Sequence, residues 1–266
     1  MCDSCGCGGN QQHHHHAHDH GDDAAHRRAH ELGLPHEHQH HDAPAVDPAV
    51  ALILKENDRL AERNRGFFLA KKLLVLNLIS APGAGKTALL EATFRAADKK
   101  FRSAVITGDL QTDNDARRLR AAGGPAIQIT TGTACHLDAH MLQHALAQLD
   151  LDALDVLFIE NVGNLVCPTL FDLGEDARVA LWSVTEGDDK PLKYPQIFQS
   201  AALTVVTKSD LVAATEFPRA AALAHLRTVA PHTDVLELSA QTGAGLDSWF
   251  TWVATHLAAK RARKFH

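Results

Sequence analysis

Between residues 73 and 260 the chain alternates short apolar runs with longer stretches of helical periodicity, and this alternation admits few folds. Each run is too short to form a helix, and several are followed directly by an amphipathic stretch. Strands that are buried on both faces and joined by crossover helices form a mostly parallel, doubly wound α/β sheet. The runs are Leu73–Ile79, Ala104–Thr107, Ala126–Ile129, Val156–Ile159, Val179–Val184, Leu203–Thr207 and Val235–Leu238. The expected helices cover Thr87–Ala97, Asp113–Ala122, His136–Leu149, Glu216–Val229 and Leu246–Lys260.

The first 45 residues differ in kind from the rest of the chain. Of the 19 histidines, 12 lie before residue 45, whereas the only large apolar residues before Pro44 are Met1, Leu32 and Leu34. So few apolar side chains cannot offset an ordering entropy of roughly 1–2 kcal/mol per residue. We therefore expect a disordered metal-binding tail over residues 1–45, a linking helix over 46–72 that begins at Asp47-Pro48, and a globular domain over 73–260.

Charge and hydropathy exclude two classes of partner. Lys and Arg number 26 against 32 Asp and Glu, a formal net charge of −6, which is the reverse of the balance that binding to a phosphate backbone favours. We therefore expect no nucleic-acid partner. Because no stretch approaches roughly 18 uninterrupted apolar residues and the N-terminus carries no apolar secretion segment, we expect no membrane association and a cytoplasmic location.

The first apolar run ends in a phosphate-loop pattern, Ser80-Ala81-Pro82-Gly83-Ala84-Gly85-Lys86-Thr87, with Ser80 where the first glycine usually stands. Glycines let backbone N–H groups converge on phosphates, Lys86 supplies a positive charge, and Thr87 offers its hydroxyl to Mg²⁺. A glycine-rich turn without a ligand is the alternative, but the preceding strand and the following helix favour phosphate binding. The residues expected to bind the nucleotide here are Gly83, Ala84, Gly85, Lys86, Thr87 and Ala88.

A second run ends in Thr207-Lys208-Ser209-Asp210, which indicates selection of guanine. The Asp210 carboxylate can accept from the N1–H and N2–H₂ edge of guanine, which adenine does not present, while the Lys208 stem covers the base. Alone, the string is a common strand-to-turn transition, and Thr207 stands where asparagine is commoner. The next strand ends before Ser239-Ala240, where guanine-binding proteins often add a backbone contact, and this position strengthens the interpretation.

Two more runs end in carboxylates, at Asp109 and at Glu160. Both lie at the edge expected to carry the phosphate loop, so they can reach Mg²⁺ directly or through water, and Gly163 can offer its N–H to the γ-phosphate. The alternative is a pair of solvated loop carboxylates. We expect Lys86, Asp109 and Glu160 to be the catalytic residues, and Thr87, Asp109 and Glu160 to hold magnesium.

The odd number of cysteines, five, argues against a disulfide framework and for reduced thiols that bind metal or react. Cys2, Cys5 and Cys7 place three thiolates within six residues, enough to wrap one soft or borderline cation. The alternative is an oxidation-prone terminus. The histidines of the tail bind Ni²⁺, Zn²⁺, Co²⁺ or Cu²⁺, and composition alone does not name the metal.

The remaining cysteines, Cys135 and Cys167, lie on loops expected near the nucleotide edge, and His136 follows Cys135 at once. Inert burial is the usual fate of such a cysteine. Because every cysteine of the chain can then be assigned to a metal site, we interpret Cys135, His136 and Cys167 as a second one. His140 and His144 extend the same helical face, where a merely polar face is the commoner explanation.

Taken together, these motifs resemble the HypB family of nickel-incorporation GTPases of hydrogenase maturation. The resemblance spans about Leu52 to Leu257 and the extreme N-terminus. Beyond the motifs already described it includes Gly108–Asp115, Cys135–Ala139, Glu160–Pro168 and Val184–Pro195, although Ala88 replaces the commoner threonine. It implies a P-loop GTPase domain of the SIMIBI class over residues 73–260.

The resemblance also implies cofactors and partners: GTP with Mg²⁺, nucleotide- or metal-dependent homodimerisation, and delivery of Ni²⁺ to the [NiFe]-hydrogenase large-subunit precursor with a HypA-type partner. It implies a tight nickel site at Cys2, Cys5 and Cys7, and a weaker nickel or zinc (Zn²⁺) site at Cys135, His136 and Cys167. One alternative is a urease-type accessory GTPase, which the motifs of the Cys residues disfavour. The other is a nickel storage protein, which the motifs of the nucleotide site disfavour.

The spacing of the motifs also suggests how the two sites communicate. Cys167 lies seven residues after Glu160, so a rearrangement of this loop on loss of the γ-phosphate would move a metal ligand. Nucleotide state and metal affinity would then be linked reciprocally. No glutamine placed to position water follows Gly163, and Gln111 is only a candidate, so we expect slow intrinsic turnover.

Overall fold

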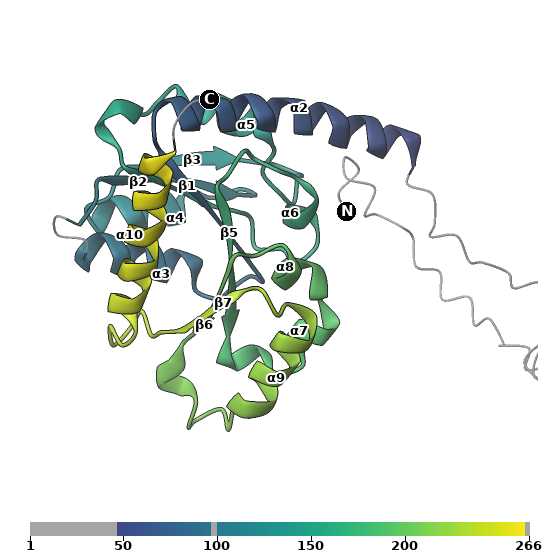
Figure 1. The fold of residues 1–266 in the computed structure, drawn as a ribbon, viewed down its shortest axis with the longest axis vertical. Coiled ribbons are helices and arrows are strands. Elements are labelled where there is room, and N and C mark those ends of the chain that lie inside the picture. The colour runs from purple at the N-terminus through teal and green to yellow at the C-terminus, as the bar shows by residue number, and fades with distance from the viewer. Residues whose placement is uncertain (1–46, 97–99, 264–266) are drawn as a thin grey trace, which may run out of the picture.

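A computed structural model of the chain describes residues 47–96 and 100–263 (Figure 1). The tail predicted over residues 1–45, with Cys2, Cys5, Cys7 and the histidine-rich segment, lies outside the described residues. The described residues contain a seven-stranded sheet of order β3-β2-β4-β1-β5-β6-β7 in which all neighbours pair parallel. The strands are β1 Leu74–Ser80, β2 Ser103–Asp109, β3 Ala126–Thr130, β4 Val156–Glu160, β5 Ala177–Ser183, β6 Leu203–Thr207 and β7 Asp234–Glu237. The predicted doubly wound sheet is confirmed.

Helices cover both faces of the sheet because alternate strand residues point to opposite sides. On β1, Leu74, Leu76 and Leu78 belong to one apolar cluster, whereas Val75 and the preceding Leu73 belong to another. The first cluster packs against α3 Lys86–Ala96, α4 Asn114–Ala121 and α10 Leu246–Ala262. The opposite face is covered by α2 Pro48–Ala70, α5 Ala139–Leu146, α8 Pro195–Gln199 and α9 Arg219–Val229.

The structure corrects the start of two predicted helices. Helix α5 begins at Ala139 rather than His136 because the Asp138 side chain accepts a hydrogen bond from Met141 N (2.7 Å) and caps it. Helix α9 begins at Arg219 rather than Glu216, since Pro218 disfavours a helical residue before it. Several short elements were not predicted because so few residues show no periodicity: α6 Cys167–Leu170, α7 Lys190–Lys193, η1 Leu151–Ala153, η2 Val184–Glu186 and η3 Ser209–Leu211.

The helix α2 begins as predicted, with Asp47 as its N-cap and Pro48 at its first position, and its N-terminal part projects beyond the sheet in Figure 1. Its C-terminal part is anchored to two loops by buried amides. Asn64 Nδ2 donates to Ala139 O (3.1 Å) and to Leu173 O (3.2 Å). Asn57 Oδ1 accepts from Ala139 N (2.9 Å). The linking helix is therefore an integral layer of the folded domain.

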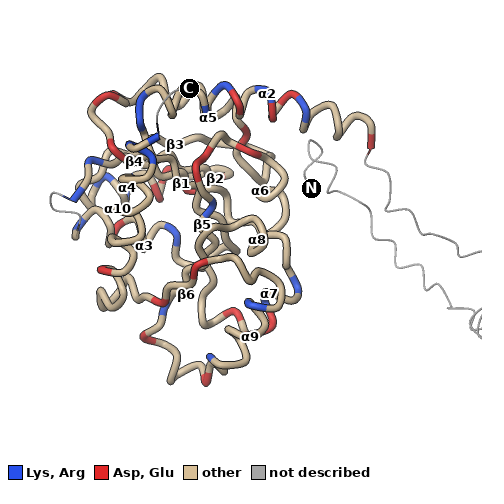
Figure 2. Tube along the Cα trace, viewed as in Figure 1, with Lys and Arg blue, Asp and Glu red and all other residues tan. Residues whose placement is uncertain are grey.

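None of the helices among the described residues is long and apolar enough to span a bilayer. Figure 2 shows acidic and basic residues interspersed along the described chain, with both kinds on α2.

Substitution of Gly174 tests how closely α2 packs against the rest of the domain. Its φ is +86°, and a Cβ there would lie 2.6 Å from Ala61 O on α2, whereas Gly123, with φ +93°, has open space around the same position. Both alanine variants suffer the backbone strain of positive φ, but only Gly174→Ala also displaces α2. We expect Gly174→Ala to lose several degrees more in thermal melting temperature than Gly123→Ala, as measured by circular dichroism. Equal losses would show that α2 is not tightly docked there.

Candidate functional site

The phosphate loop lies between β1 and α3, where its conformation requires glycine. Gly85 has a φ of +102°, a backbone conformation that residues with a side chain rarely adopt. Lys86 and Thr87 open α3 and are both buried. Lys86 Nζ donates to Ser80 Oγ (3.0 Å), and Thr87 Oγ1 donates to Glu160 Oε1 (2.6 Å). The lysine and the hydroxyl therefore point toward the end of the sheet, where phosphates and a hard cation would lie.

Thr207 supports this loop from a neighbouring strand. Its hydroxyl donates to Ala84 O (2.6 Å), which ties the end of β6 to the phosphate loop. The sequence suggested only that threonine here departs from the commoner asparagine. Instead, the short β-branched side chain joins the candidate guanine segment to the candidate phosphate segment, 123 residues apart in the chain.

A cavity of about 520 Å³ opens beside the phosphate loop. It is lined by most of the residues predicted to hold phosphate and magnesium, together with Lys208: Gly83, Gly85, Lys86, Thr87, Ala88, Asp109, Glu160 and Gly163. A second cavity of about 380 Å³ is lined by predicted base-binding residues, Thr207, Lys208, Asp210 and Ala240. Gly85, Ala88, Arg118 and Lys208 line both, so the two cavities form one elongated site with a phosphate half and a base half.

Two of the predicted nucleotide residues do not line either cavity. Ala84 is buried, and its carbonyl accepts the Thr207 bond. Ser239 is also buried, and its hydroxyl accepts from Thr242 N (3.1 Å) within the turn that follows β7. Ser239 therefore shapes the turn that presents Ala240, whereas Ala240 itself reaches the base half.

Burial sets the electrostatics of the phosphate half. It raises the pKa of Glu160 from its ordinary 4.5 to about 7, although the Lys86 charge and the Thr87 hydrogen bond act in the opposite direction. Burial likewise lowers the pKa of Lys86, against the favourable charge of Glu160. Asp109 is less buried: burial raises its pKa, but hydrogen bonds from the N–H groups of Thr112 and Gln111 outweigh this and leave it lowered.

The donor set suits magnesium. Thr87, Glu160 and Asp109 offer the hard oxygen ligands that Mg²⁺ prefers. Within the described residues, Glu160 Oε2 is buried without a hydrogen-bond partner, an uncommon state for a buried carboxylate oxygen and one that a cation would relieve. Bound magnesium would supply positive charge beside the phosphates and favour the ionised form of Glu160.

Charged residues from α3 and α4, which the sequence did not predict, also line the site. Arg118 lines both halves, donates to Glu91 Oε1 (3.0 Å) and Oε2 (2.9 Å), and lies 3.6 Å from Asp115 Oδ1. Glu91 and Arg95 line only the base half. No sequence signal singled them out, because a charged residue on an amphipathic helix usually faces solvent. The position of Arg118 at the junction of the two halves is where the first phosphate of a nucleotide would lie.

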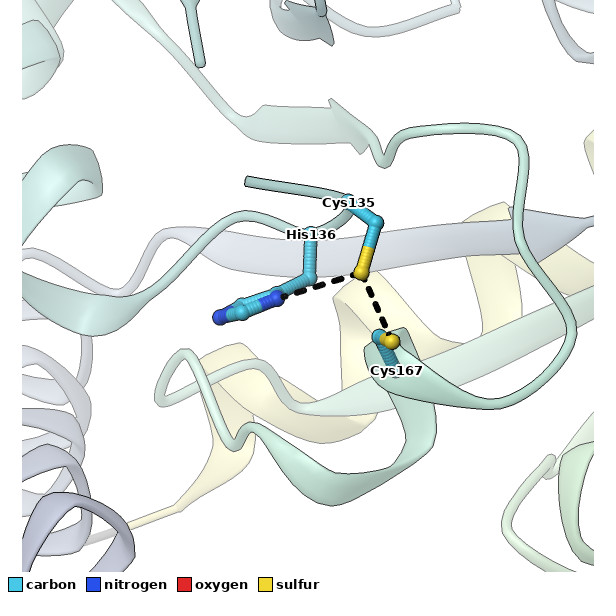
Figure 3. Close-up of side chains that lie close together, drawn as sticks. All are labelled: Cys135, His136 and Cys167. Carbon is cyan, nitrogen blue, oxygen red and sulfur yellow. Dashed lines mark hydrogen bonds between the residues drawn. The ribbon is translucent and has the colours of Figure 1, made fainter. Parts of the chain in front are cut away.

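The candidate metal centre lies at the same edge of the sheet (Figure 3). Ligand atoms of Cys135, His136 and Cys167 all lie within 4.8 Å of one another, with 2.7 Å between the two Sγ atoms and 3.9 Å between Cys135 Sγ and His136 Nδ1. Cys167 opens α6, whose first N–H groups, at Val166 and Cys167, donate to Asn164 Oδ1. The structure thus brings together the three predicted ligands from segments that are 32 residues apart.

The surroundings of His136 favour metal binding. Its ring stacks on Phe171 at a centroid distance of 3.7 Å. Burial lowers its pKa, against the opposing charge of Asp138, so the imidazole is neutral at physiological pH, the form that coordinates metal. Two thiols and one imidazole suit a borderline cation such as Zn²⁺ or Ni²⁺. On the adjacent helix α5, His140 Nε2 and His144 Nε2 lie 3.2 Å apart.

The fold and this site together define a P-loop nucleotide-binding protein with an adjacent candidate metal centre. Residues 74–237 match the family model described as CobW/HypB/UreG, nucleotide-binding domain. The chain therefore belongs to the CobW/HypB/UreG GTPases, and within them, on the relatives below, to the HypB hydrogenase maturation factors.

Hydrogenase maturation factor HypB of Azotobacter vinelandii is 53% identical over 201 residues, which cover 76% of this chain and 66% of that protein. The HypB of Escherichia coli K12 is 52% identical over 207 residues, covering 78% of this chain and 71% of that protein. The chain thus matches about two thirds of the length of these relatives. The crystal structure of HypB from Helicobacter pylori in complex with nickel superposes with a TM-score of 0.74 at 38% identity, over 79% of this chain and 99% of that one.

The raised pKa of Glu160 predicts a pH-dependent stability. A folded-state pKa of about 7 above an ordinary value of 4.5 means that stability is full below about pH 4.5 and is lost as the pH rises through about 7. Glutamine mimics the neutral acid at every pH. We therefore expect nucleotide-free Glu160→Gln to melt several degrees above the parent at pH 8 with a smaller gap at pH 5, and to lose magnesium-dependent hydrolysis.

Glu62, on the solvent side of α2 with 71% of its side chain exposed, provides the matched control, and Glu62→Gln should show no such pH-dependent gap. A gap that stays constant between pH 5 and pH 8 for Glu160→Gln would contradict the raised pKa.

Arg118→Ala should weaken binding of GMP and GDP about tenfold while leaving guanosine unaffected, because a charged hydrogen bond to phosphate contributes roughly 1.5–3 kcal/mol. Arg95→Ala is the control, since Arg95 lines only the base half and should not distinguish GMP from guanosine. Isothermal titration with the three ligands measures this. Equal losses for guanosine and GMP would place Arg118 at the base instead.

Proposed function

We propose that this chain is a GTP-hydrolysing nickel carrier that binds Ni²⁺ and delivers it to the [NiFe]-hydrogenase large-subunit precursor. One observation carries the proposal: Cys135, His136 and Cys167 converge within 4.8 Å at the sheet edge that also holds the phosphate loop. Nickel is the cargo here. A centre of three protein donors leaves coordination positions open, through which a metal can be passed on by ligand exchange. Zinc competes for the same donors.

The nucleotide residues have the following proposed roles. Lys86 neutralises phosphate charge, Thr87 and Glu160 hold magnesium, and Asp109 assists them through its lowered pKa. Asp210 selects guanine with Lys208, and Gly163 contacts the terminal phosphate. Gln111 does not line the phosphate half, which supports slow intrinsic hydrolysis.

Hydrolysis would control the metal through the segment that joins the two sites. Glu160 ends β4, and Cys167 opens α6 seven residues later. A Cβ on Gly163, within this segment, would lie 2.9 Å from Pro82 Cα, so the segment is in close contact with the phosphate loop. Loss of the terminal phosphate would shift this segment and change the affinity of the metal centre, and bound metal would change nucleotide affinity by the same factor.

The assembly that we propose follows from exposed apolar side chains around the same edge. Val166 is 44% exposed, Leu170 is 43% exposed, and Leu110 beside Asp109 is 42% exposed. These side chains favour a homodimer that closes over nucleotide and metal. The tail of residues 1–45 would store nickel and supply it, a HypA-type partner would take part in delivery in the cytoplasm, and the GTPase domain would extend over 73–260 with 46–72 as the linking helix.

The shared metal centre can be tested in the full-length chain with Cys2, Cys5 and Cys7 replaced by serine, so that only Cys135 and Cys167 give thiolate-to-nickel absorption. Cys167→Ala and His136→Ala should each weaken nickel binding, with free nickel set by a chelating buffer. The double variant should be little worse than either single variant, because ligands of one ion act as a unit. Additive losses would show that they do not share an ion.

The client is tested separately. Full-length protein loaded with ⁶³Ni should transfer metal to a hydrogenase large-subunit precursor in the presence of GTP, and Lys86→Ala should not support this transfer. Transfer to a urease apoprotein alone would overturn the proposed client while leaving the metal centre in place.

A further inference from the structure

Glu160, the last residue of β4, and Asn161, which follows it, lie where the phosphate half meets the segment that carries His136. Along β4, Phe158 belongs to the apolar cluster on the α3 side and Ile159 to the cluster on the α5 side. Glu160 accepts from Thr87 at the phosphate loop, whereas Asn161 lines the same phosphate half and also accepts from Leu137 N, next to His136. A displacement of this strand end would therefore reach both the phosphate half and the His136 segment.

Asn161 holds the segment that carries His136. Its side chain is 1% exposed, and its Oδ1 accepts from Leu137 N (3.1 Å) and from Val162 N (2.9 Å). Two backbone donors on one atom fix the orientation of the amide, so Nδ2 is the atom that donates to Asn77 Oδ1 (3.3 Å). Because Leu137 follows His136 directly, the position of the imidazole depends on this amide.

The same amide reaches the Cys167 segment through a buried polar chain. Asn77 Nδ2 donates to Glu175 Oε1 (3.2 Å), which also accepts from Arg178 Nε (2.7 Å). Arg178 in turn donates to Thr169 O (2.8 Å) and Phe171 O (3.2 Å), at α6 and the residue after it. Asn161 thus lies at the junction of two arms, one to His136 and one to the helix that begins with Cys167.

Burial makes this network act as a unit. Asn77 is fully buried in the middle of β1, and Glu175 is 6% exposed. A polar group that lost its partner here could not turn to water, and an unsatisfied buried group is strongly unfavourable. Movement of Asn161 would therefore carry its partners along rather than break the hydrogen bonds.

We propose that Asn161 is the positioning residue that couples nucleotide state to the metal centre, through Leu137 to His136 and through Asn77, Glu175 and Arg178 to the Cys167 helix. This inference rests on the proposed linkage between nucleotide and nickel and names its route. The side chain of Asn161 bonds to Leu137, Val162 and Asn77, so it acts through the segments that present the metal ligands.

The test measures the coupling factor, which is the ratio of nickel dissociation constants with GDP and with a non-hydrolysable GTP analogue. It uses the full-length chain with Cys2, Cys5 and Cys7 replaced by serine, thiolate-to-nickel absorption, and buffered free nickel. In this parent protein we expect the two nickel dissociation constants to differ by at least about fivefold, as is usual for coupled sites. In Asn161→Ala the two nickel dissociation constants should differ by no more than about twofold.

Asn64 provides the matched control. It is also a buried amide, 4% exposed, and it also bonds the loops that follow the two ligand segments, at Ala139 and Leu173, but from α2 and without contact to the nucleotide side. Asn64→Ala should weaken nickel binding in both nucleotide states and keep the parental ratio. A residue with a merely structural role at position 161 would behave in the same way as Asn64.

The outcomes separate the two proposals. A parent ratio of one would overturn the linkage proposed above. A parental ratio retained in a folded Asn161→Ala variant would overturn only the route through Asn161. Asn77→Ala, which leaves the bonds of Asn161 to Leu137 and Val162 intact, provides a second measurement if Asn161→Ala does not fold. It should reduce the ratio partly, and an unchanged ratio would overturn the arm to the Cys167 helix.

Discussion

Parallel pairing makes every strand of this sheet end at the same edge, and the chemistry of the protein depends on this constraint. Strands β1, β2, β4 and β6 end in Ser80, Asp109, Glu160 and Thr207, and all four lie in the phosphate loop or beside it. An antiparallel partner would have placed half of these strand ends on the far side of the sheet. Because the crossover helices occupy both faces, the edge is the place left for ligands.

Two faces at one edge also explain why the nucleotide and metal sites can be adjacent without merging. The nucleotide cavity lies toward α3 and α4, whereas the metal centre lies on loops next to α5 and α6. Strand β4 ends in the carboxylate Glu160, and the amide Asn161 follows it. The carboxylate suits a hard cation, and the neutral amide, which both donates and accepts, suits a buried joint between backbone segments.

The helix α2 also fixes the segments that carry the candidate metal ligands. Its Asn57 and Asn64 hold Ala139, three residues after His136, while Asn64 also holds Leu173, a few residues after the Cys167 helix. The metal ligands are thus presented by loops that are fixed from the sheet side by Asn161 and from the outside by α2.

The sequence by itself determined the features that depend on neighbouring residues. These are the parallel sheet, from apolar runs too short for helices; the phosphate loop, from contiguous residues 80–87; and the candidate metal ligands Cys135, His136 and Cys167, which the structure brings within 4.8 Å of one another. Every predicted strand lies within two residues of its observed bounds. The predicted sites at Cys2, Cys5 and Cys7 stay predictions, because they lie outside the described residues.

Only the tertiary structure decided the contacts between residues far apart in the chain. Thr207 meets Ala84 across 123 residues and Asn77 meets Glu175 across 98, and neither pair shares a local pattern that periodicity could detect. Arg118 looks like a solvated residue of an amphipathic helix until the fold places it between two cavities. The starts of α5 and α9 depended on the Asp138 cap and on Pro218, which override the periodicity of the sequence. Local spacing specifies which chemistry a segment can supply, whereas its partners are specified by how strands and helices pack, because burial and hydrogen bonding are satisfied over the whole chain at once.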